Sequence, residues 1–428
     1  MNIYNNVKGT IDLYNNDIIN IEYLINKIKK IFILYGYEFI KTPSIENINI
    51  IKIIKNNSNL PLIYNIEKKK FLIFDLTIPL LRFCLKNNNK IIFPFKRFQI
   101  QKVWRKDNPQ NNRYREFYQC DFDIIGFKSY FEELEIILLC DKIFNNIHLP
   151  IIFFINHIDI LYGLCEYCKI PKKKWFFLIK NIDKLNNNNF FLIKKILLKK
   201  IIKKKINKLF FFFKKNFKNI IFLKYLKKKF KKNKKYGING TIYLIKLFKL
   251  IKKFKLKHTN LIFKIFLSRG LNYYSKTIFE IKYINNKLSL GGGGRYDNII
   301  KINNKKIKGI GLSLGLYRIY NQIKTLKINL KLKNKKKFLF INFGKENYLI
   351  INKYANFLRK KNIIINIYPY NEKLKKQIKY AIKNEFNYII ILGKLEINKK
   401  IIKIKNLITK KEYIFNNINS LIKFFNNE

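Results

Sequence analysis

The sequence predicts an α+β domain built on an antiparallel sheet, interrupted by a helical insertion and followed by a smaller α/β domain. Three observations predict this fold. Two segments of alternating polarity, Arg97–Arg105 and Arg113–Asp123, flank a short turn; a lysine-rich stretch with helical spacing occupies the middle; and strand and helix patterns alternate near the end. Eight of the sixteen glycines lie between Gly270 and Gly315, where tight turns or close backbone approach are expected.

The first predicted elements are a helix and a hairpin. Apolar residues recur every three or four positions over Ile18–Leu34, which indicates an amphipathic helix. The loop Lys106–Asn112 contains Asp107, Asn108 and Pro109, which favour a turn between two antiparallel strands. Alternation places the polar residues of both strands on one face: Arg97, Gln99, Gln101 and Arg105, then Arg113, Arg115, Gln119, Asp121 and Asp123. This polar face could simply be exposed to solvent. It could also bind a small polar ligand at both ends, because residues four apart on a strand project in the same direction about 13 Å apart.

The later elements define the domain organisation. The first domain is predicted at residues 1–323, with the helical insertion at about 165–257 and a hairpin turn near Asn285-Asn286. A lysine-rich linker at 324–337 precedes an α/β domain at 338–428. Its predicted strands are Phe338–Phe343, Ile363–Tyr368 and Tyr388–Leu392, and its predicted helices are Tyr348–Lys361 and Glu372–Asn384.

The charge of the chain has two interpretations. The 89 Lys and Arg exceed the 26 Asp and Glu and give a formal net charge of +63. Polyanion binding would explain this charge. Compositional drift would also explain it, because Lys, Asn, Ile, Phe and Tyr, which have A/T-rich codons, crowd the whole sequence. The longest apolar runs, such as Leu209–Phe213, are far too short for a membrane span, and 48% apolar residues suffice for folded cores.

The five cysteines indicate a reducing compartment, because they are few and scattered. The pair Cys165 and Cys168 has the spacing of half a zinc site, but no second pair is near and only His148 and His157 are close. We therefore expect buried thiols and no protein-bound metal. The N-terminal segment has neither an apolar signal core nor an arginine-rich leader, which favours a cytoplasmic protein.

The positions of the few arginines are the most specific indication of a ligand-binding site in this sequence. Lysine supplies positive charge almost everywhere, so the nine arginines suggest positions that need a planar fork for carboxylates or phosphates. Structural ion pairs are the alternative. The glycine-rich segments lack the spacing of a P-loop or a dinucleotide-binding turn. A bound nucleotide would therefore be held by arginine side chains on a sheet.

Segments along nearly the whole chain resemble, in the correct order, the motifs of histidyl-tRNA synthetases, which are class II aminoacyl-tRNA synthetases. The segment Tyr35–Pro43 is similar to the first class II motif, at the family's dimer interface. The remaining similar segments are the amino-group loop Asp75-Leu76-Thr77, the second class II motif Arg105–Gly126, the histidine motifs Arg269–Tyr274 and Gly291–Asp297, and the third class II motif Gly309–Ile319.

The resemblance implies roles for individual residues. Arg105, Arg269 and Arg318 would be catalytic, at the α-phosphate, the reacting centre and the γ-phosphate of ATP. Asp107 and Arg113 would add ATP contacts. The ammonium of histidine would be held by Asp75, Leu76, Thr77 and Gln119, and its imidazole by Asp123 with Tyr273 or Tyr274. A carboxylate and a phenol can satisfy both ring nitrogens.

The resemblance also implies the activity. Histidine would be activated with ATP and Mg²⁺ to histidyl-adenylate and pyrophosphate, then transferred to the 3′ end of tRNA(His), in a cytoplasmic homodimer. The last domain would bind the anticodon, and the insertion would contact the acceptor end. The alternatives are a catalytically silent regulatory subunit of ATP phosphoribosyltransferase and a general RNA-binding protein. Three departures, Ile73, Asn272 and Tyr317, each remove a charge that the family pattern has near the site.

Overall fold

The computed structural model describes residues 4–53, 62–110, 112–127, 129–185, 189–213, 218–231, 236–269, 274–285, 288–297, 300–302, 305–328, 330 and 336–427. The chain divides into two compact units, Met1–Leu330 and Lys331–Glu428. Leu330 is buried in the core of the first unit together with Ile323. The first unit therefore extends slightly beyond the end that the lysine-rich composition suggested.

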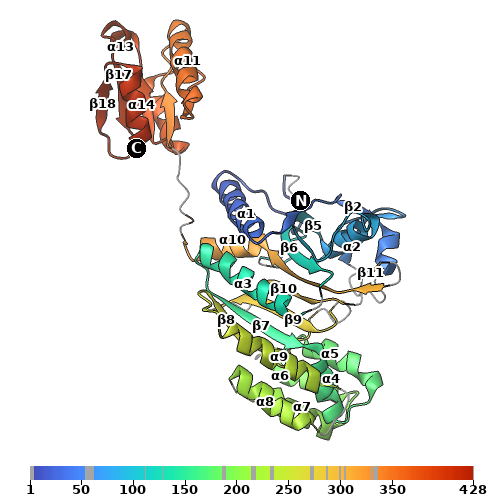
Figure 1. Ribbon diagram of the computed structural model, residues 1–428. Coiled ribbons are helices and arrows are strands. Elements are labelled where there is room, and N and C mark those ends of the chain that lie inside the picture. Colours follow the sequence, from blue (N-terminus) through green and yellow to red (C-terminus); the bar gives the residue numbers. More distant parts are fainter. Residues whose placement is uncertain are drawn as a thin grey trace. The chain divides into compact units, whose positions relative to one another are not determined.

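An eight-stranded sheet forms the centre of the first unit (Figure 1). Its strands in spatial order are β1 (Glu38–Phe39), β5 (Phe95–Trp104), β6 (Glu116–Ile125), β13 (Gly309–Gly315), β10 (Ser289–Arg295), β9 (Thr277–Tyr283), β7 (Ile151–His157) and β8 (Thr259–Phe263). The strands from β5 to β7 are antiparallel, whereas β1 and β8 join the two edges in parallel. Each edge pair is separated by a long crossover, as a parallel pairing requires. The antiparallel sheet is confirmed in its centre, and the whole sheet is mixed.

The predicted hairpin is β5 paired with β6. Its register places Arg97 opposite Asp123 and Gln101 opposite Gln119. The second predicted hairpin is β9 paired with β10, and Asn285 lies in its turn. Asn286 falls outside the described residues.

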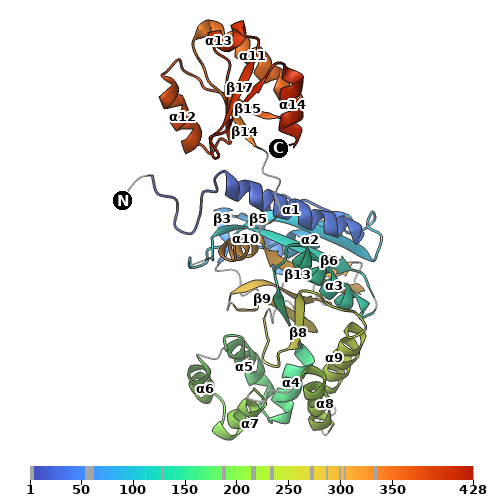
Figure 2. The ribbon, with the colours of Figure 1, turned by 90° about the vertical axis from the view of Figure 1, so that its left-hand side faces the viewer.

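Three helices cover one face of the sheet: α1 (Asn16–Leu34), α3 (Phe131–Asn146) and α10 (Leu316–Thr325) (Figure 2). The ring of Phe32 on α1 stacks on Phe98 with centroids 4.8 Å apart and also contacts Phe122. Cys120 and Phe122 thus belong to this core. Because side chains alternate along a strand, Gln119, Asp121 and Asp123 face away from these helices.

All the regular elements that the structure describes in the insertion are helices, and they pack beside β7 and β8 (Figure 1). It contains α4 (Ile158–Tyr167), the short helix η3 (Lys172–Lys174), α5 (Trp175–Ile182), α6 (Phe190–Leu198), α7 (Lys203–Phe213), α8 (Asn219–Phe230) and α9 (Ile238–Ile251). Its lysine-rich sequence still buries one apolar stripe per helix, such as Phe222, Leu226 and Phe230 on α8. No helix among the described residues combines the length and apolarity needed to cross a membrane.

Smaller elements beside β5 were not predicted from the sequence. They are β2 (Ile45–Asn47), η1 (Ile48–Ile53), β3 (Tyr64–Glu67), β4 (Lys70–Leu72), α2 (Thr77–Lys86), β11 (Ile300–Ile302) and β12 (Lys305–Ile307). The helix α2 begins at Thr77, and the carboxylate of Asp75 accepts a hydrogen bond from the backbone N–H of Ile78 at 3.1 Å. This contact satisfies a donor of the first helical turn and fixes Asp75.

The second unit is a separate five-stranded α/β fold with its own core. Its sheet order is β15 (Ile364–Ile367), β14 (Lys337–Phe340), β16 (Tyr388–Ile391), β17 (Ile402–Asn406) and β18 (Glu412–Phe415). Its helices are α11 (Lys345–Lys360), α12 (Leu374–Lys383), α13 (Lys394–Asn398) and α14 (Ile418–Asn427). The three predicted strands and two predicted helices are present with slightly different bounds, and the sequence analysis had not anticipated β17, β18, α13 or α14.

All five cysteines are buried free thiols. Burial raises the pKa of Cys84 and of Cys168 to about 12. Because a thiolate is the reactive form, we expect the folded protein to react slowly with a thiol reagent at pH 8 and all five to react after unfolding. Colorimetric thiol titration with and without denaturant would measure this. We also expect no bound zinc at Cys165 and Cys168; one equivalent that survives dialysis and disappears in a double serine variant would contradict it.

Candidate active site

A cavity of about 360 Å³ opens on the face of the sheet opposite α1 and α3. Strands β6, β10 and β13 supply its floor, and the loops after Phe74 and Trp104 supply its walls. Gly291, Gly292 and Gly293 of β10 line it. A Cβ atom on Gly293 would lie 2.1 Å from the carbonyl oxygen of Gly311, so this strand pairing requires glycine there. The glycine-rich sequence therefore lets the backbone itself form part of the cavity.

Four arginines line this cavity, Arg105, Arg113, Arg269 and Arg318. Backbone and side-chain acceptors hold them. The Nε of Arg105 donates to the carbonyl of Phe74 at 2.7 Å, and the guanidinium of Arg105 lies 5.2 Å from the ring of Phe117. Arg113 makes a two-pronged contact with Asp107 at 2.8 and 3.2 Å. Such contacts fix the orientation of a planar fork.

The other two arginines converge near Ser289. Arg318 donates to the carbonyl of Ser289 at 2.8 Å, and Arg269 donates to the hydroxyl of the same residue at 2.8 Å. Burial, together with the like charges of Arg269, Arg113 and Arg105, lowers the pKa of Arg318 to about 10. Four guanidinium groups repelling one another in one cavity form a site for a polyanion such as a triphosphate.

A second cluster, of acceptors, lines the same cavity: Asp75, Thr77, Gln119 and Asp121, with Ser313 and Tyr274 beside them. The Nε2 of Gln119 donates to the hydroxyl of Ser313 at 2.8 Å. Burial raises the pKa of Tyr274, so its hydroxyl keeps its proton. This cluster suits a small ligand that carries a positive charge and further polar groups.

Asp123 does not line the cavity and lies behind its wall. One carboxylate oxygen is 2.7 Å from the guanidinium of the fully buried Arg97, and the other accepts a hydrogen bond from the hydroxyl of Tyr296. A Cβ atom on Gly311 would collide with this carboxylate, so Gly311 makes room for it. Burial raises the pKa of Asp123, and Arg97 and Tyr296 oppose that shift.

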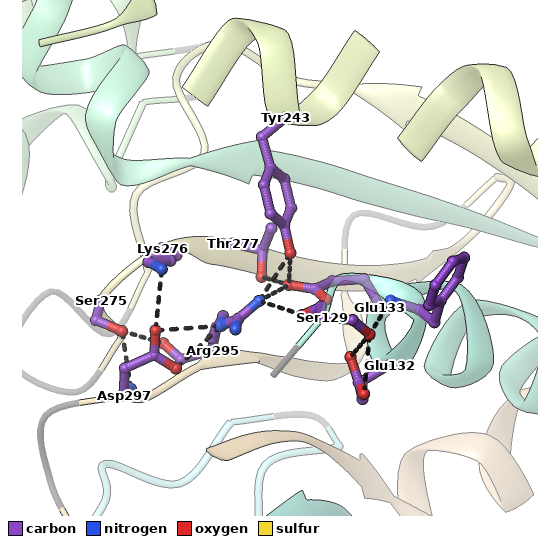
Figure 3. A network of polar contacts seen from close by, with 10 residues as sticks. Ser129, Glu132, Glu133, Tyr243, Ser275, Lys276, Thr277, Arg295 and Asp297 are labelled. Atoms are coloured by element: carbon purple, nitrogen blue, oxygen red, sulfur yellow. Dashed lines mark hydrogen bonds and ion pairs between the residues drawn. The ribbon is translucent and has the colours of Figure 1, made fainter. Parts of the chain in front are cut away.

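Arg295 does not line the cavity and instead lies in a buried polar network, which Figure 3 shows. It contacts Glu133 of α3 at 3.1 Å, Asp297 at 2.9 Å and the hydroxyl of Tyr243 of α9 at 2.8 Å. Glu133 also accepts hydrogen bonds from Tyr243 and Thr277. This buried network joins the insertion to the strands that carry the glycine-rich segment.

The insertion also contacts Ser268, the residue that precedes Arg269. The hydroxyl of Ser268 donates to the carbonyl of Ile179 on α5, and Asp183 follows directly after that helix. Burial raises the pKa of Asp183, and the charge of Arg269 is the largest opposing influence. Arg269 further contacts Glu280 at 3.1 Å. Glu280 and the hydroxyl of Ser289 therefore hold this arginine, and the charge of Asp183 in the insertion also acts on it.

The cavity brings together most of the residues that the sequence singled out. Its lining includes Asp75, Thr77, Arg105, Asp107, Arg113, Gln119, Arg269, Tyr274 and Arg318. The side chain of Leu76 packs in a small core with Ile73 and Val103 instead. Tyr273 and Asn272 lie outside the described residues. Tyr317 lines the cavity and packs edge-on against Tyr114 and Tyr118.

The sequence analysis assigned no ligand to several further lining residues: Tyr114, Phe117, Asp121, Ser289, Ser313 and Tyr317. It did place Asp121 on the polar strand face with Gln119, and it noted Tyr317 as a departure near the site. Ser289 and Ser313 carried no comparable signal.

Among the described residues no group of three or more His, Cys, Asp or Glu could hold a metal ion.

Comparisons with known proteins agree with these features. Residues 9–319 match the family model described as histidyl-tRNA synthetase, and residues 337–428 match the one described as anticodon binding domain. A curated relative from Azobacteroides pseudotrichonymphae, named histidine–tRNA ligase, is 34% identical over 452 residues, covering 98% of this chain and 98% of the relative.

Solved structures show the same fold. Histidyl-tRNA synthetase from Nostoc sp. PCC 7120 superimposes with a TM-score of 0.82 and 23% identity, covering 99% of each chain. An ATP phosphoribosyltransferase regulatory subunit/histidyl-tRNA synthetase from Bacillus halodurans C has a TM-score of 0.75 and 15% identity, covering 91% of this chain and 98% of that one. At these identities the likeness concerns the fold alone.

Proposed function

The chain belongs to the histidyl-tRNA synthetase family of class II aminoacyl-tRNA synthetases, and from this premise we propose how its cavity performs histidine–tRNA ligation. In this reaction the carboxylate of histidine attacks the α-phosphorus of ATP, which gives histidyl-adenylate and pyrophosphate. The terminal ribose hydroxyl of tRNA then attacks the adenylate carbonyl. The observation that carries the proposal is the meeting, in one cavity, of four arginines and a cluster of acceptors.

The arginine side of the cavity would hold ATP. Negative charge builds up on phosphate oxygens during adenylate formation, and fixed cations stabilise that charge without reorganising. Arg105 would contact the α-phosphate and Arg318 the γ-phosphate, with Arg269 at the reacting centre. Arg113, fixed by Asp107, would be a further nucleotide contact. ATP would enter as its magnesium complex, and no step here is assigned to a protein-bound metal.

The acceptor side would hold histidine. Asp75, Thr77 and Gln119 would bind the ammonium, and the Tyr274 hydroxyl one ring nitrogen. The motif resemblance assigns the other ring nitrogen to Asp123. This carboxylate lies behind the cavity wall, where Arg97 and Tyr296 occupy two of its about four acceptor positions, so its direct contact with histidine is the assignment that the following variant tests. An amino acid with an apolar side chain would leave these polar groups unpaired.

Asp123→Asn should have two measurable effects. Losing the charged acceptor should weaken histidine binding by about 1.5–3 kcal/mol. It also leaves the buried Arg97 without its counter-charge, which should lower the free energy of unfolding by about 3 kcal/mol. Histidine and ATP KM values in pyrophosphate exchange, together with urea unfolding, would measure both. If the variant were less stable but had an unchanged histidine KM, the role of Asp123 would be purely structural.

The second unit would bind the anticodon of tRNA(His), and the lysine-rich insertion would contact the acceptor end. The match of residues 337–428 to an anticodon-binding family supports the first assignment. The net charge of +63 suits a polyanionic partner, although compositional drift accounts for part of that charge equally well.

We further propose a homodimer in the cytoplasm. At the end of α1 and on the edge strand β1, Ile33, Leu34 and Phe39 are 64%, 80% and 50% exposed, an apolar surface suited to a second copy. The segment resembling the family's dimer motif, Tyr35–Pro43, lies in the same place. Buried free thiols suit a reducing compartment.

Histidine-dependent exchange of pyrophosphate into ATP tests the proposal. Exchange with histidine and not with other amino acids is expected, followed by charging of tRNA(His). Binding of histidine without exchange would instead favour the regulatory-subunit alternative. That alternative has less support, because the curated relative named histidine–tRNA ligase matches over nearly the full length.

A further inference from the structure

Two acceptor atoms in the cavity wall are buried and have no hydrogen-bond donor among the described residues, Oε1 of Gln119 and Oδ1 of Asp121. Both residues line the cavity and lie two positions apart on the same face of β6. A buried acceptor without a donor is destabilising. Such a pair therefore marks a place that the donors of a ligand would fill.

The hydroxyl of Ser313 fixes the orientation of both acceptors. Ser313 lies opposite Asp121 in the pairing of β13 with β6. Its hydroxyl accepts from Nε2 of Gln119 at 2.8 Å and also hydrogen-bonds the carboxylate of Asp121. The amide nitrogen of Gln119 is thus engaged within the wall.

The charge at this place is negative. Asp123 has its counter-charge in Arg97 at 2.7 Å, whereas the carboxylates of Asp75 and Asp121 both line the cavity. Burial raises the pKa of Asp121 to about 7, Arg97 opposes the shift, and Asp123 and Asp75 add to it. A cationic group between Asp75 and Asp121 would relieve their repulsion and restore the ionised form.

We propose that Asp121 is a specificity-determining residue whose carboxylate accepts a hydrogen bond from the ammonium group of bound histidine. An ammonium carries three donors, and Asp75, Gln119 and Asp121 are three acceptor residues that line the same cavity. The inference rests on the proposed function and adds a residue that the motif resemblance did not assign to histidine. It predicts that a histidine analogue without the α-amino group binds this site much more weakly than histidine does.

The test compares two ligands, L-histidine and imidazole-4-propionate, which lacks the amino group. Their affinities for the full-length protein and for Asp121→Asn would be measured by calorimetry. The ratio of the affinity for L-histidine to the affinity for imidazole-4-propionate should fall about tenfold or more in the variant, which is the loss expected for a charge-assisted hydrogen bond. The affinity for ATP should stay unchanged. Asp159→Asn on α4, away from the cavity, is the matched control and should keep the parental preference.

Thermal unfolding adds a readout that separates a ligand contact from a structural one. Burial raises the pKa of folded Asp121 from 3.8 to about 7, so the folding stability of the empty protein falls as pH rises from about 4 to about 7, and the loss is complete above pH 7. At pH 8 the Tm of Asp121→Asn should therefore equal or exceed the parental Tm. Asp121→Ser provides a second variant for the ligand comparison should the amide not fold.

If Asp121→Asn lowered the affinity for both ligands equally, or left the ratio of the two affinities unchanged, the role of Asp121 would be overturned. If the parental protein binds histidine and the variant keeps the parental affinity ratio, only the inference about Asp121 is wrong. If the parental protein neither binds histidine nor exchanges pyrophosphate, the proposed function itself is wrong.

Discussion

Arg269→Lys should reduce histidine-dependent pyrophosphate exchange by about 10²–10³-fold, the loss seen when one preorganised transition-state donor is removed. Lysine keeps the positive charge, so the net charge beside Glu280 does not change. What is lost is the fork that contacts Glu280 at 3.1 Å and Ser289 at 2.8 Å while it faces the cavity. A burst or steady-state exchange assay at saturating histidine and ATP would measure the effect on kcat.

The matched control is Arg359→Lys in the second unit, where the guanidinium donates to the carbonyl of Ile365. Exchange by this variant should be unchanged. Circular dichroism and urea unfolding would establish that Arg269→Lys is folded. Near-parental exchange by a folded Arg269→Lys protein would show that the fork is dispensable and that this arginine is not catalytic.

A truncated protein ending at Leu330 should keep adenylate formation and lose most tRNA charging. Every residue that lines the cavity lies in the first unit, and the core of the second unit is built from its own strands and helices. Residual charging should fall by about 10³-fold between 50 and 200 mM salt, because the remaining tRNA binding would rest on lysine–phosphate contacts. The cut belongs after Leu330 and not near Gln322, since Ile323 and Leu330 complete the first core.

Pyrophosphate exchange and tRNA charging, measured side by side at both salt concentrations, would test this division of labour. Sedimentation should still show a dimer, because the exposed apolar residues near Phe39 remain. Full charging by the truncated protein at physiological salt would contradict the anticodon role of the second unit. Loss of exchange in a folded truncation would show that the two units depend on each other.

Several features were determined by the sequence alone because they are local. Alternation along Arg97–Arg105 and Arg113–Asp123 fixed which residues share a face, and the paired register confirms it. The scarcity of arginine marked Arg105, Arg113, Arg269 and Arg318, all of which line the cavity. The motif resemblance then supplied the family, which the comparisons show.

Other features were decided by residues far apart in the chain. Arg97 and Arg295 carry the same fork as the cavity arginines but face buried protein carboxylates. No local pattern separates the two groups, because Arg295 pairs with Glu133, 162 positions away, as well as with the nearby Asp297. The edge strands β1 and β8 pair in parallel for a similar reason: long crossovers, not their own sequences, bring them to the sheet.

The division is clearest along the single strand β6. Its sequence placed Gln119, Asp121 and Asp123 on one face, and it could not say which of the two aspartates opens onto the cavity. The tertiary structure decides this, because Arg97 and Tyr296 enclose Asp123 while Ser313 leaves Asp121 in the wall. Periodicity determines the direction in which a side chain points, and only packing against distant segments determines whether it meets protein or ligand.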